Sequence, residues 1–222
     1  FLARVTGPVA AWSAAVLLAC TPRLAGHAHF LTTDVHVAFG CTLALACHAR
    51  WLEERRVRFA VGVTLGIALA LGSKITGILA VVPPALATLV VRGPRRARDI
   101  LVDGAMLFLA LASALILFCL QHPVTWDAPV SRLLELVEQG RTWTRTMPFT
   151  AMYLGYIGPH TGLPWHFPLV MAFLASLPQV ILLAIPGVLV ATRSVMGQSI
   201  LCAVAFWGLF ASTSAFPRYD NE

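Results

Sequence analysis

Charged side chains are scarce in this sequence. Asp, Glu, Lys and Arg make up 12% of its 222 residues, whereas hydrophobic residues make up 58% and the mean hydropathy is +0.79. A soluble domain carries about 25% charged residues, so this composition excludes one and predicts an all-α, polytopic transmembrane helical bundle. The net charge of +6 is therefore assigned to the loops between spans, which predicts contact with membrane lipid and not with nucleic acid.

Familiar catalytic and metal-binding motifs are absent as well. There is no GxSxG, HExxH, phosphate-binding P-loop or dinucleotide-binding fingerprint in a suitable context. The five cysteines form no CxxC pair or other metal-ligand spacing, so they indicate small core residues without a redox role. No cleavable signal peptide is recognisable, and both ends lie close to apolar runs. We therefore expect the natural chain to continue beyond Phe1 and Glu222.

Apolar runs long enough to cross a bilayer, about 20 helical residues each, are plentiful. The clear candidate spans are residues 5–21, 35–49, 101–120, 168–191 and 199–216. The run 59–91 is too long for one span and carries Lys74 near its middle, where a buried amine costs about 2.5–3.5 kcal/mol. Two shorter helices with Lys74 at their turn avoid this cost, so the sequence predicts about seven spans.

Clusters of arginine support this arrangement. Residues 50–58 and residues 92–98 each contain four arginines, and positively charged short loops stay in the cytoplasm. Both clusters can lie there only if an even number of spans separates them. The resulting order places Asp34, Lys74 and the long loop 121–167 on the external face. We expect residues 1–222 to form part of a single multi-pass transmembrane module.

The long external loop is predicted to carry a short amphipathic helix at the membrane interface. In TWDAPVSRLLELVEQG, residues 125–140, Asp127 suits the N-cap, Pro129 suits the first turn and Gly140 suits a helix stop. The apolar residues between them follow at helical spacing: Val130, Leu133, Leu134 and Val137.

Asp34 directly precedes an apolar run in the segment GHAHFLTTDVHVAFG, residues 26–40. One interpretation is a carboxylate that faces an external cavity and orients a hydroxyl group. The other is a helix N-cap, a position where Asp is favoured. His27 and His29 form an HxH pair that needs a third ligand to hold a metal ion, and His36 suits packing as well as a site. The residues alone leave these alternatives open.

Lys74 is costly between two apolar runs unless its amine snorkels to the surface or binds an anion. Arg218 and Tyr219 follow the last apolar run. They suit interfacial anchors, and equally a phosphate site shared with Lys74, because a guanidinium group matches the geometry of a phosphate.

Four segments, taken in order, resemble the GT-C membrane glycosyltransferases. The nearest branch comprises the dolichyl-phosphate-mannose–protein mannosyltransferase-like enzymes of family 39 and their bacterial relatives, including aminoarabinose transferases. The segments are GHAHFLTTDVHVAFG, GVTLGIALALGSKITGILAVVP, YLGYIGPHTGLPWHFPLVMAFLASLP and STSAFPRYDNE. The resemblance covers about residues 5–222, and Phe167 stands where the relatives' PWHYP-like loop has tyrosine.

This resemblance implies inverting transfer of a sugar from a polyprenyl-phosphate donor to a protein, lipid or glycan acceptor. It also implies a bacterial inner (plasma) membrane, with the active face external. The main catalytic aspartate of such enzymes lies in the first external loop and is expected upstream of Phe1, which leaves Asp34 as an auxiliary acid. No cofactor or metal site is assigned, the dependence on a divalent metal ion stays open, and the lipid-linked sugar is the expected donor substrate. The other site residues implied are Lys74, Arg218 and Tyr219 at the donor phosphate, and His29, Trp165 and His166 on the acceptor side.

Two other classes of protein are weighed against this one. A transporter or lipid flippase also needs polar groups that face a cavity, but such proteins usually show internal repeats with paired broken helices, and no convincing repeat occurs here. A non-catalytic membrane scaffold leaves the external set of Asp34, Lys74, Arg218 and Tyr219 without a role.

Overall fold

The computed structural model describes residues 8–19, 33–93, 97–146, 150–153, 156–159, 164, 166, 170 and 192–213. This part of the chain is mostly helical, which confirms the predicted all-α membrane bundle. Its helices are α2 (Pro8–Ala19), α4 (Thr33–Glu54), α5 (Val57–Ser73), η1 (Ile75–Val81), α6 (Val82–Arg92), α7 (Ala97–Gln121), η2 (Pro123–Thr125), α8 (Pro129–Thr146) and α11 (Val195–Thr213). Its strands are β1 (Thr150–Tyr153) and β2 (Tyr156–Pro159), which pair antiparallel.

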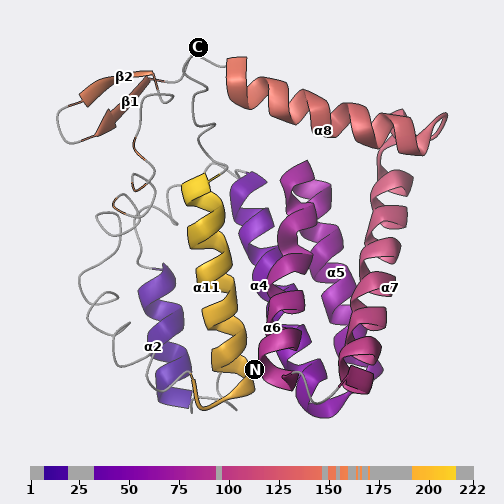
Figure 1. Cartoon of the computed structure of the whole chain (residues 1–222), viewed down its shortest axis with the longest axis vertical. Coiled ribbons are helices and arrows are strands. Elements are labelled where there is room, and N and C mark those ends of the chain that lie inside the picture. The colour runs from indigo at the N-terminus through magenta and orange to yellow at the C-terminus, as the bar shows by residue number, and fades with distance from the viewer. Residues whose placement is uncertain are drawn as a thin grey trace.

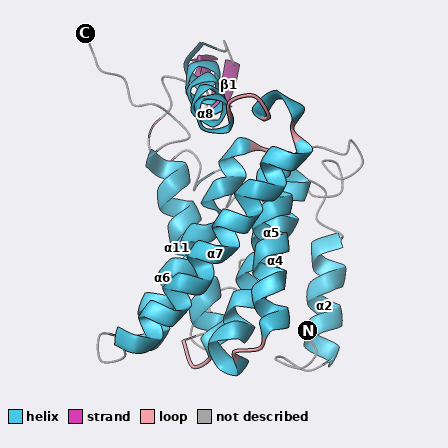
Figure 2. Cartoon of the chain, turned by 90° about the vertical axis from the view of Figure 1, so that its right-hand side faces the viewer, coloured by secondary structure: helices cyan, strands magenta, loops and turns pink. Residues whose placement is uncertain are grey.

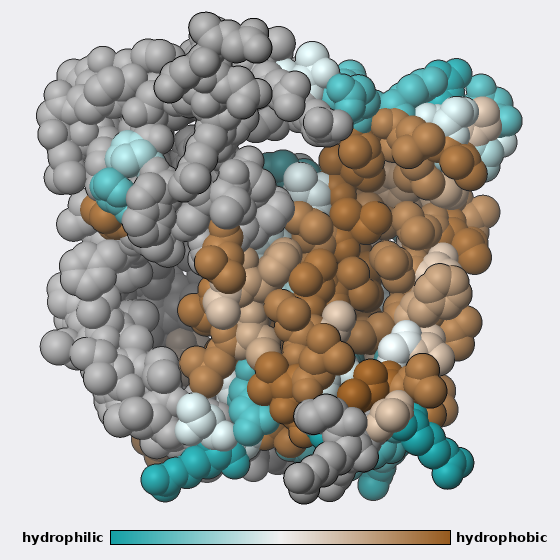
Figure 3. Space-filling view, viewed as in Figure 1, coloured by the Kyte–Doolittle hydropathy of each residue, from teal (hydrophilic) through white to brown (hydrophobic). Residues whose placement is uncertain are grey.

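The long helices stand side by side, and α8 lies across one end of them (Figure 1 and Figure 2). Helix α4 packs mainly on α5, α5 packs on α7, and α11 packs on α6. Hydrophobic side chains cover the middle of the face shown in Figure 3, whereas hydrophilic side chains gather along its lower edge and over the outer part of α8. A broad apolar belt between two polar rims is the surface expected of a protein in a bilayer.

Three of the described helical segments are long and apolar enough to cross a membrane: Thr33–Glu54, Ile75–Arg92 and Ala97–Gln121. Val57–Ser73 and Val195–Trp207 are shorter apolar helices. The described residues within the predicted spans 5–21, 35–49, 101–120 and 199–216 are helical, and helices also lie in both halves of the run 59–91. The predicted span 168–191 lies outside the described residues except for Val170, so the count of seven stays a prediction.

Lys74 interrupts the run 59–91, as predicted from the cost of burying its amine. Helix α5 ends at Ser73, and Lys74 is extended, with φ −160° and ψ 136°. The 3-10 helix η1 begins immediately afterwards and continues into α6. Gly77 makes the tight return feasible, because a Cβ atom there would lie 2.1 Å from the backbone oxygen of Ala70.

Small residues bring α4 and α5 into close contact. A Cβ atom added at Gly40 would lie 2.6 Å from the backbone oxygen of Gly66, and one added at Gly66 would lie 2.5 Å from the backbone nitrogen of Ala44. Such contacts between helix backbones are typical of membrane proteins. In lipid there is no hydrophobic driving force between helices, so small residues let the backbones approach closely and associate through van der Waals packing. The pairing of these helices determines which residues meet at their ends.

Replacing Gly66 with alanine is therefore expected to lower the free energy of unfolding by about 1–3 kcal/mol, the usual cost of overpacking. Gly104→Ala is the matched control, because nothing lies within 4 Å of a Cβ atom added there. Alanine has the higher helix propensity at both positions, so a difference between the variants reports packing. Thermal unfolding of the purified protein in detergent measures it, and equal melting temperatures would contradict the close contact.

The loop 121–167 differs from its prediction in three respects. Helix α8 continues through Gly140 to Thr146, so the predicted stop is wrong, because one glycine in a helix costs only about 1 kcal/mol. The helix begins at Pro129, so Asp127 is not its N-cap. Instead, Arg132 Nη2 donates to Asp127 Oδ2 at 3.3 Å, and this hydrogen bond lowers the pKa of the Asp127 carboxyl group. The β1–β2 hairpin was not predicted.

Candidate functional site

The structure brings Asp34 and Lys74 together. Lys74 Nζ donates to Asp34 Oδ1 at 3.0 Å, although the residues are 40 positions apart in the sequence. Asp34 is the second residue of α4, and Lys74 follows the last residue of α5. The two helices pack against each other and are joined by a short turn, so the start of α4 meets the end of α5.

This ion pair is open to its surroundings, with side-chain exposures of 49% for Lys74 and 62% for Asp34. Asp34 lies one position inside α4, and so it is not the helix N-cap, which was the second of the two interpretations of its sequence position. A carboxylate in the first turn still interacts favourably with the helix dipole. Both charged groups are thus held at one end of the bundle and remain accessible to a ligand.

The end of the bundle that carries Lys74, called here the Lys74 end, also includes the end of α7. His122 stacks on Phe118 with ring centroids 4.0 Å apart, and its Nδ1 lies 2.9 Å from the Phe118 backbone oxygen. Thr125 Oγ1 and Trp126 Nε1 both donate to the backbone oxygen of Cys119, at 3.0 and 2.9 Å. These bonds satisfy carbonyl groups that the helix end leaves open, and they direct the chain into α8.

The other predicted site residues cannot all be placed relative to this pair. His29, Trp165, Arg218 and Tyr219 lie outside the described residues. His166 is half-buried, and its backbone oxygen accepts a hydrogen bond from the Val170 N–H at 3.0 Å. Their roles therefore stay predictions.

Metal binding was an open alternative for the HxH pair. Among the residues that the structure describes, no group of three or more His, Cys, Asp or Glu side chains could hold a metal ion. His27 and His29 themselves lie outside those residues, and His36 is exposed on α4.

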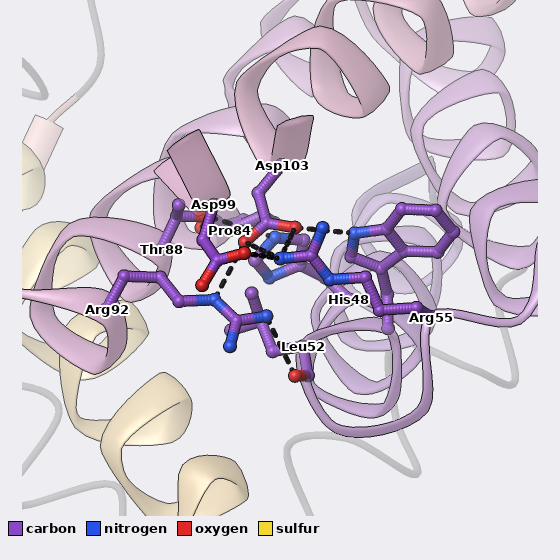
Figure 4. A network of polar contacts seen from close by, with 9 residues as sticks. His48, Leu52, Arg55, Pro84, Thr88, Arg92, Asp99 and Asp103 are labelled. Atoms are coloured by element: carbon purple, nitrogen blue, oxygen red, sulfur yellow. Dashed lines mark hydrogen bonds and ion pairs between the residues drawn. The ribbon is translucent and has the colours of Figure 1, made fainter. Parts of the chain in front are cut away.

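A second polar cluster lies at the opposite end of the bundle, called here the arginine end, and joins two of the predicted loop arginines to an aspartate that was not predicted as a site residue. Its centre is Asp103 of α7, whose side chain is fully buried (Figure 4). Asp103 accepts hydrogen bonds from Trp51 Nε1 at 2.9 Å, Arg92 Nε at 2.9 Å and Arg55 Nη2 at 3.4 Å. Arg55 also pairs with Asp99 at 3.1 Å.

This cluster joins three helices. Arg92, near the end of α6, is 10% exposed and donates through Nη2 to the backbone oxygen of Leu52 on α4, at 2.8 Å. Arg55 reaches α7 from a left-handed conformation, φ 51°, which costs a non-glycine residue roughly 1–2 kcal/mol. Nearby, buried His48 shares a 3.1 Å hydrogen bond with Thr88. Arg55 of the first arginine cluster and Arg92 of the second thus meet at one end, with α5 and η1–α6 between them in sequence.

Charges in the cluster balance, with two arginines and two aspartates, and every ionic group has a partner. The ionic groups of this cluster therefore leave no uncompensated charge to offer a substrate, so its chemistry is that of a structural clamp. It is also remote from the ion pair. Asp34 and Trp51 lie near opposite ends of α4, roughly 25 Å apart at about 1.5 Å per residue. The Lys74 end is therefore the candidate active site.

Comparison with known protein families places this chain. The model of the family described as dolichyl-phosphate-mannose-protein mannosyltransferase matches residues 1–123. This range includes both members of the Asp34–Lys74 pair and the whole cluster around Asp103. Comparisons with curated proteins and with solved structures give no match.

Proposed function

The chain belongs to the dolichyl-phosphate-mannose-protein mannosyltransferase family, and we propose that it transfers a sugar from a polyprenyl-phosphate donor to a hydroxyl group of an acceptor. Membership makes the chain a glycosyltransferase-type membrane protein, and its apolar helices agree with this assignment. The donor class, the external location of the reaction and inversion at the anomeric carbon are parts of the proposal.

The single observation that carries the proposal is the Asp34–Lys74 pair at the open end of the bundle. Sugar transfer to a hydroxyl group needs two opposite charges close together. A carboxylate orients or deprotonates the acceptor hydroxyl, and a cation balances the charge that develops on the departing phosphate. Asp34 supplies the first kind of group as an auxiliary acid, and Lys74 supplies the second.

The position of the pair suits a lipid-linked donor. The Lys74 end is where apolar helices stop and α8 crosses over them (Figure 1). A polyprenyl chain can remain among the apolar side chains of the belt while its phosphate reaches the polar end. Val130, Leu134 and Val137 of α8 are exposed, which supports a helix whose apolar side rests in the membrane interface.

Further residues complete the proposed site. Arg218 and Tyr219 join Lys74 at the donor phosphate, since a guanidinium group can bind two phosphate oxygens at once. His29, Trp165 and His166 border the acceptor entrance. The acceptor is a protein, a lipid or a glycan.

Asp34→Asn in the full-length protein is expected to lower the rate of sugar transfer about ten- to a hundredfold, the value of one hydrogen bond to a charged group. Membrane insertion and folding should persist, because the Asp34 side chain is largely exposed. Transfer of radiolabelled sugar from a polyprenyl-phosphate donor in membranes measures the rate, and the amount of folded protein is measured in parallel.

Asp127→Asn is the matched control, since it removes another exposed carboxylate that pairs with a basic residue. Near-normal transfer by Asp34→Asn would remove this residue from the site. Movement of the lipid-linked sugar across vesicle membranes without covalent transfer would overturn the proposed reaction and favour a flippase.

A further inference from the structure

We infer that Asp34 and Lys74 form an exchange pair, in which a donor or product phosphate displaces the Asp34 carboxylate from Lys74. This inference rests on the proposed function and adds an order of events to it. The carboxylate occupies the Lys74 ammonium group before the lipid phosphate arrives. Once displaced, it is available to the acceptor hydroxyl.

The geometry makes such an exchange feasible. The contact is a single hydrogen bond at 3.0 Å between Nζ and Oδ1. About half of the Lys74 side chain and more than half of the Asp34 side chain are exposed. Ion pairs exposed to this degree contribute little stability, so separating the two groups costs the fold little. Lys74 also lies in an extended turn between α5 and η1, from which a long side chain can turn toward either partner.

Charge favours the incoming ligand. A phosphate monoester carries about −1.5 to −2 charges near neutral pH and three acceptor oxygens, whereas the Asp34 carboxylate carries one negative charge. A sugar-linked phosphodiester donor also carries one negative charge, so donor and carboxylate compete evenly for Lys74. The product, a polyprenyl phosphate monoester, should compete better. The exchange is thus predicted to be partial while the donor is bound, which frees Asp34 for the acceptor hydroxyl during transfer, and most complete after the sugar has left.

A contrast with the cluster at the arginine end shows why exchange belongs to the Lys74 end. Asp103 is fully buried and accepts hydrogen bonds from three side chains. Moving the Asp103 carboxylate away from these three donors would leave buried charged and polar groups without partners. The Asp34–Lys74 pair has no comparable barrier, because both groups can meet solvent during the change.

Equilibrium binding of farnesyl phosphate to the full-length protein in lipid nanodiscs tests this inference. If the carboxylate competes for Lys74, Asp34→Asn should bind farnesyl phosphate about two- to fivefold more tightly, the range expected for loss of an exposed pair. Lys74→Gln should bind it about tenfold more weakly or worse. In the Lys74→Gln background, adding Asp34→Asn should change the affinity little.

The double variant distinguishes exchange from a general effect of charge. An exposed carboxylate repels any phosphate, so Asp34→Asn would then tighten binding equally with and without Lys74. Asp127 lies between η2 and α8, and its carboxylate pairs with Arg132. Asp127→Asn should therefore leave the affinity for farnesyl phosphate near that of the wild type. Unchanged or weaker binding by Asp34→Asn, or equal tightening in both backgrounds, would overturn the inference.

Two further measurements complete the test. One distinguishes a prenyl phosphate from free phosphate as the ligand, and the other distinguishes failure of the exchange from failure of the proposed function. Inorganic phosphate should displace farnesyl phosphate only weakly if the prenyl chain contributes; equal affinity would make free phosphate the ligand of the pair. Sugar transfer is assayed on the same preparations. Active wild type with no tightening by Asp34→Asn rejects the exchange alone, whereas the expected binding pattern without any sugar transfer rejects the proposed function alone.

Discussion

Replacing Asp103 with alanine is expected to lower the free energy of unfolding by about 3–5 kcal/mol, the cost of removing one partner from a buried ion pair. The Asp103 side chain has no exposed surface, and the Arg92 side chain is 10% exposed. Without the carboxylate, Arg92 and Arg55 lose the buried negative charge that balances them, and the Trp51 indole N–H loses its acceptor. Native domains are stable by only about 5–15 kcal/mol, so this loss is severe.

Asp103→Asn separates the charge from the shape. Asparagine nearly preserves the volume and can still accept one hydrogen bond, but it cannot balance two arginines. We expect a loss between that of the alanine variant and zero. Equilibrium unfolding in mixed micelles with increasing SDS, followed by tryptophan fluorescence, measures the free energy of unfolding of the wild type, Asp103→Ala and Asp103→Asn.

Asp99→Ala is the matched control, because Asp99 lies one helical turn earlier on α7 and pairs only with Arg55 among the contacts described. Its side chain is 41% exposed, so its loss should cost less than about 1 kcal/mol. If Asp103→Ala and Asp99→Ala unfold alike, the cluster does not clamp α4, α6 and α7 together.

The sequence predicted best where local physical costs decide the structure. The run 59–91 is too long for one span, and burying the amine of Lys74 in a bilayer is expensive; together these predicted the break that the structure shows between Ser73 and Ile75. Loop charge predicted that the two arginine clusters share one end, and Arg92 indeed contacts Leu52. Both arguments need only local sequence and the properties of the membrane.

Asp103 was not predicted as a structural residue, because its role depends on partners that are distant in the sequence. Trp51 and Arg55 precede it by 52 and 48 residues, and nothing in the sequence around Asp103 identifies them. The usable signal was the acidic pair Asp99 and Asp103, spaced by one helical turn at the start of an apolar helix. An ionisable residue in such a helix predicts a partner, but the sequence alone does not say which arginine provides it.

The Asp34–Lys74 pair falls between these cases. Both residues were candidates, and the predicted order of helices placed them on one face. Their direct contact follows from the close packing of α4 and α5 through Gly40 and Gly66, which fixes how the helix ends align. That alignment depends on backbone contacts that a sequence pattern does not specify, so the residues alone left both an N-cap and a site open for Asp34.

Lys74→Ala is expected to lower the turnover number for sugar transfer about 100- to 1,000-fold, the effect of removing one group that stabilises developing negative charge. The proposed role gives Lys74 this task at the departing phosphate. The same change should lower stability by no more than about 1 kcal/mol, because its pair with Asp34 is exposed. Loss of activity in folded protein is therefore the expected result.

Lys74→Arg distinguishes phosphate binding from snorkelling. A lysine that only reaches for the membrane surface can be replaced by arginine or by alanine at the end of a helix with similar effects on activity. A phosphate ligand cannot, because arginine keeps the charge while alanine removes it, so Lys74→Arg should retain more transfer than Lys74→Ala. Arg132→Ala, which removes an exposed cation paired with Asp127 and Glu135, should remain near the wild-type rate. Equal rates for all three variants would return Lys74 to the role of an interfacial anchor, since a cation whose position and charge do not affect turnover does not meet the leaving group.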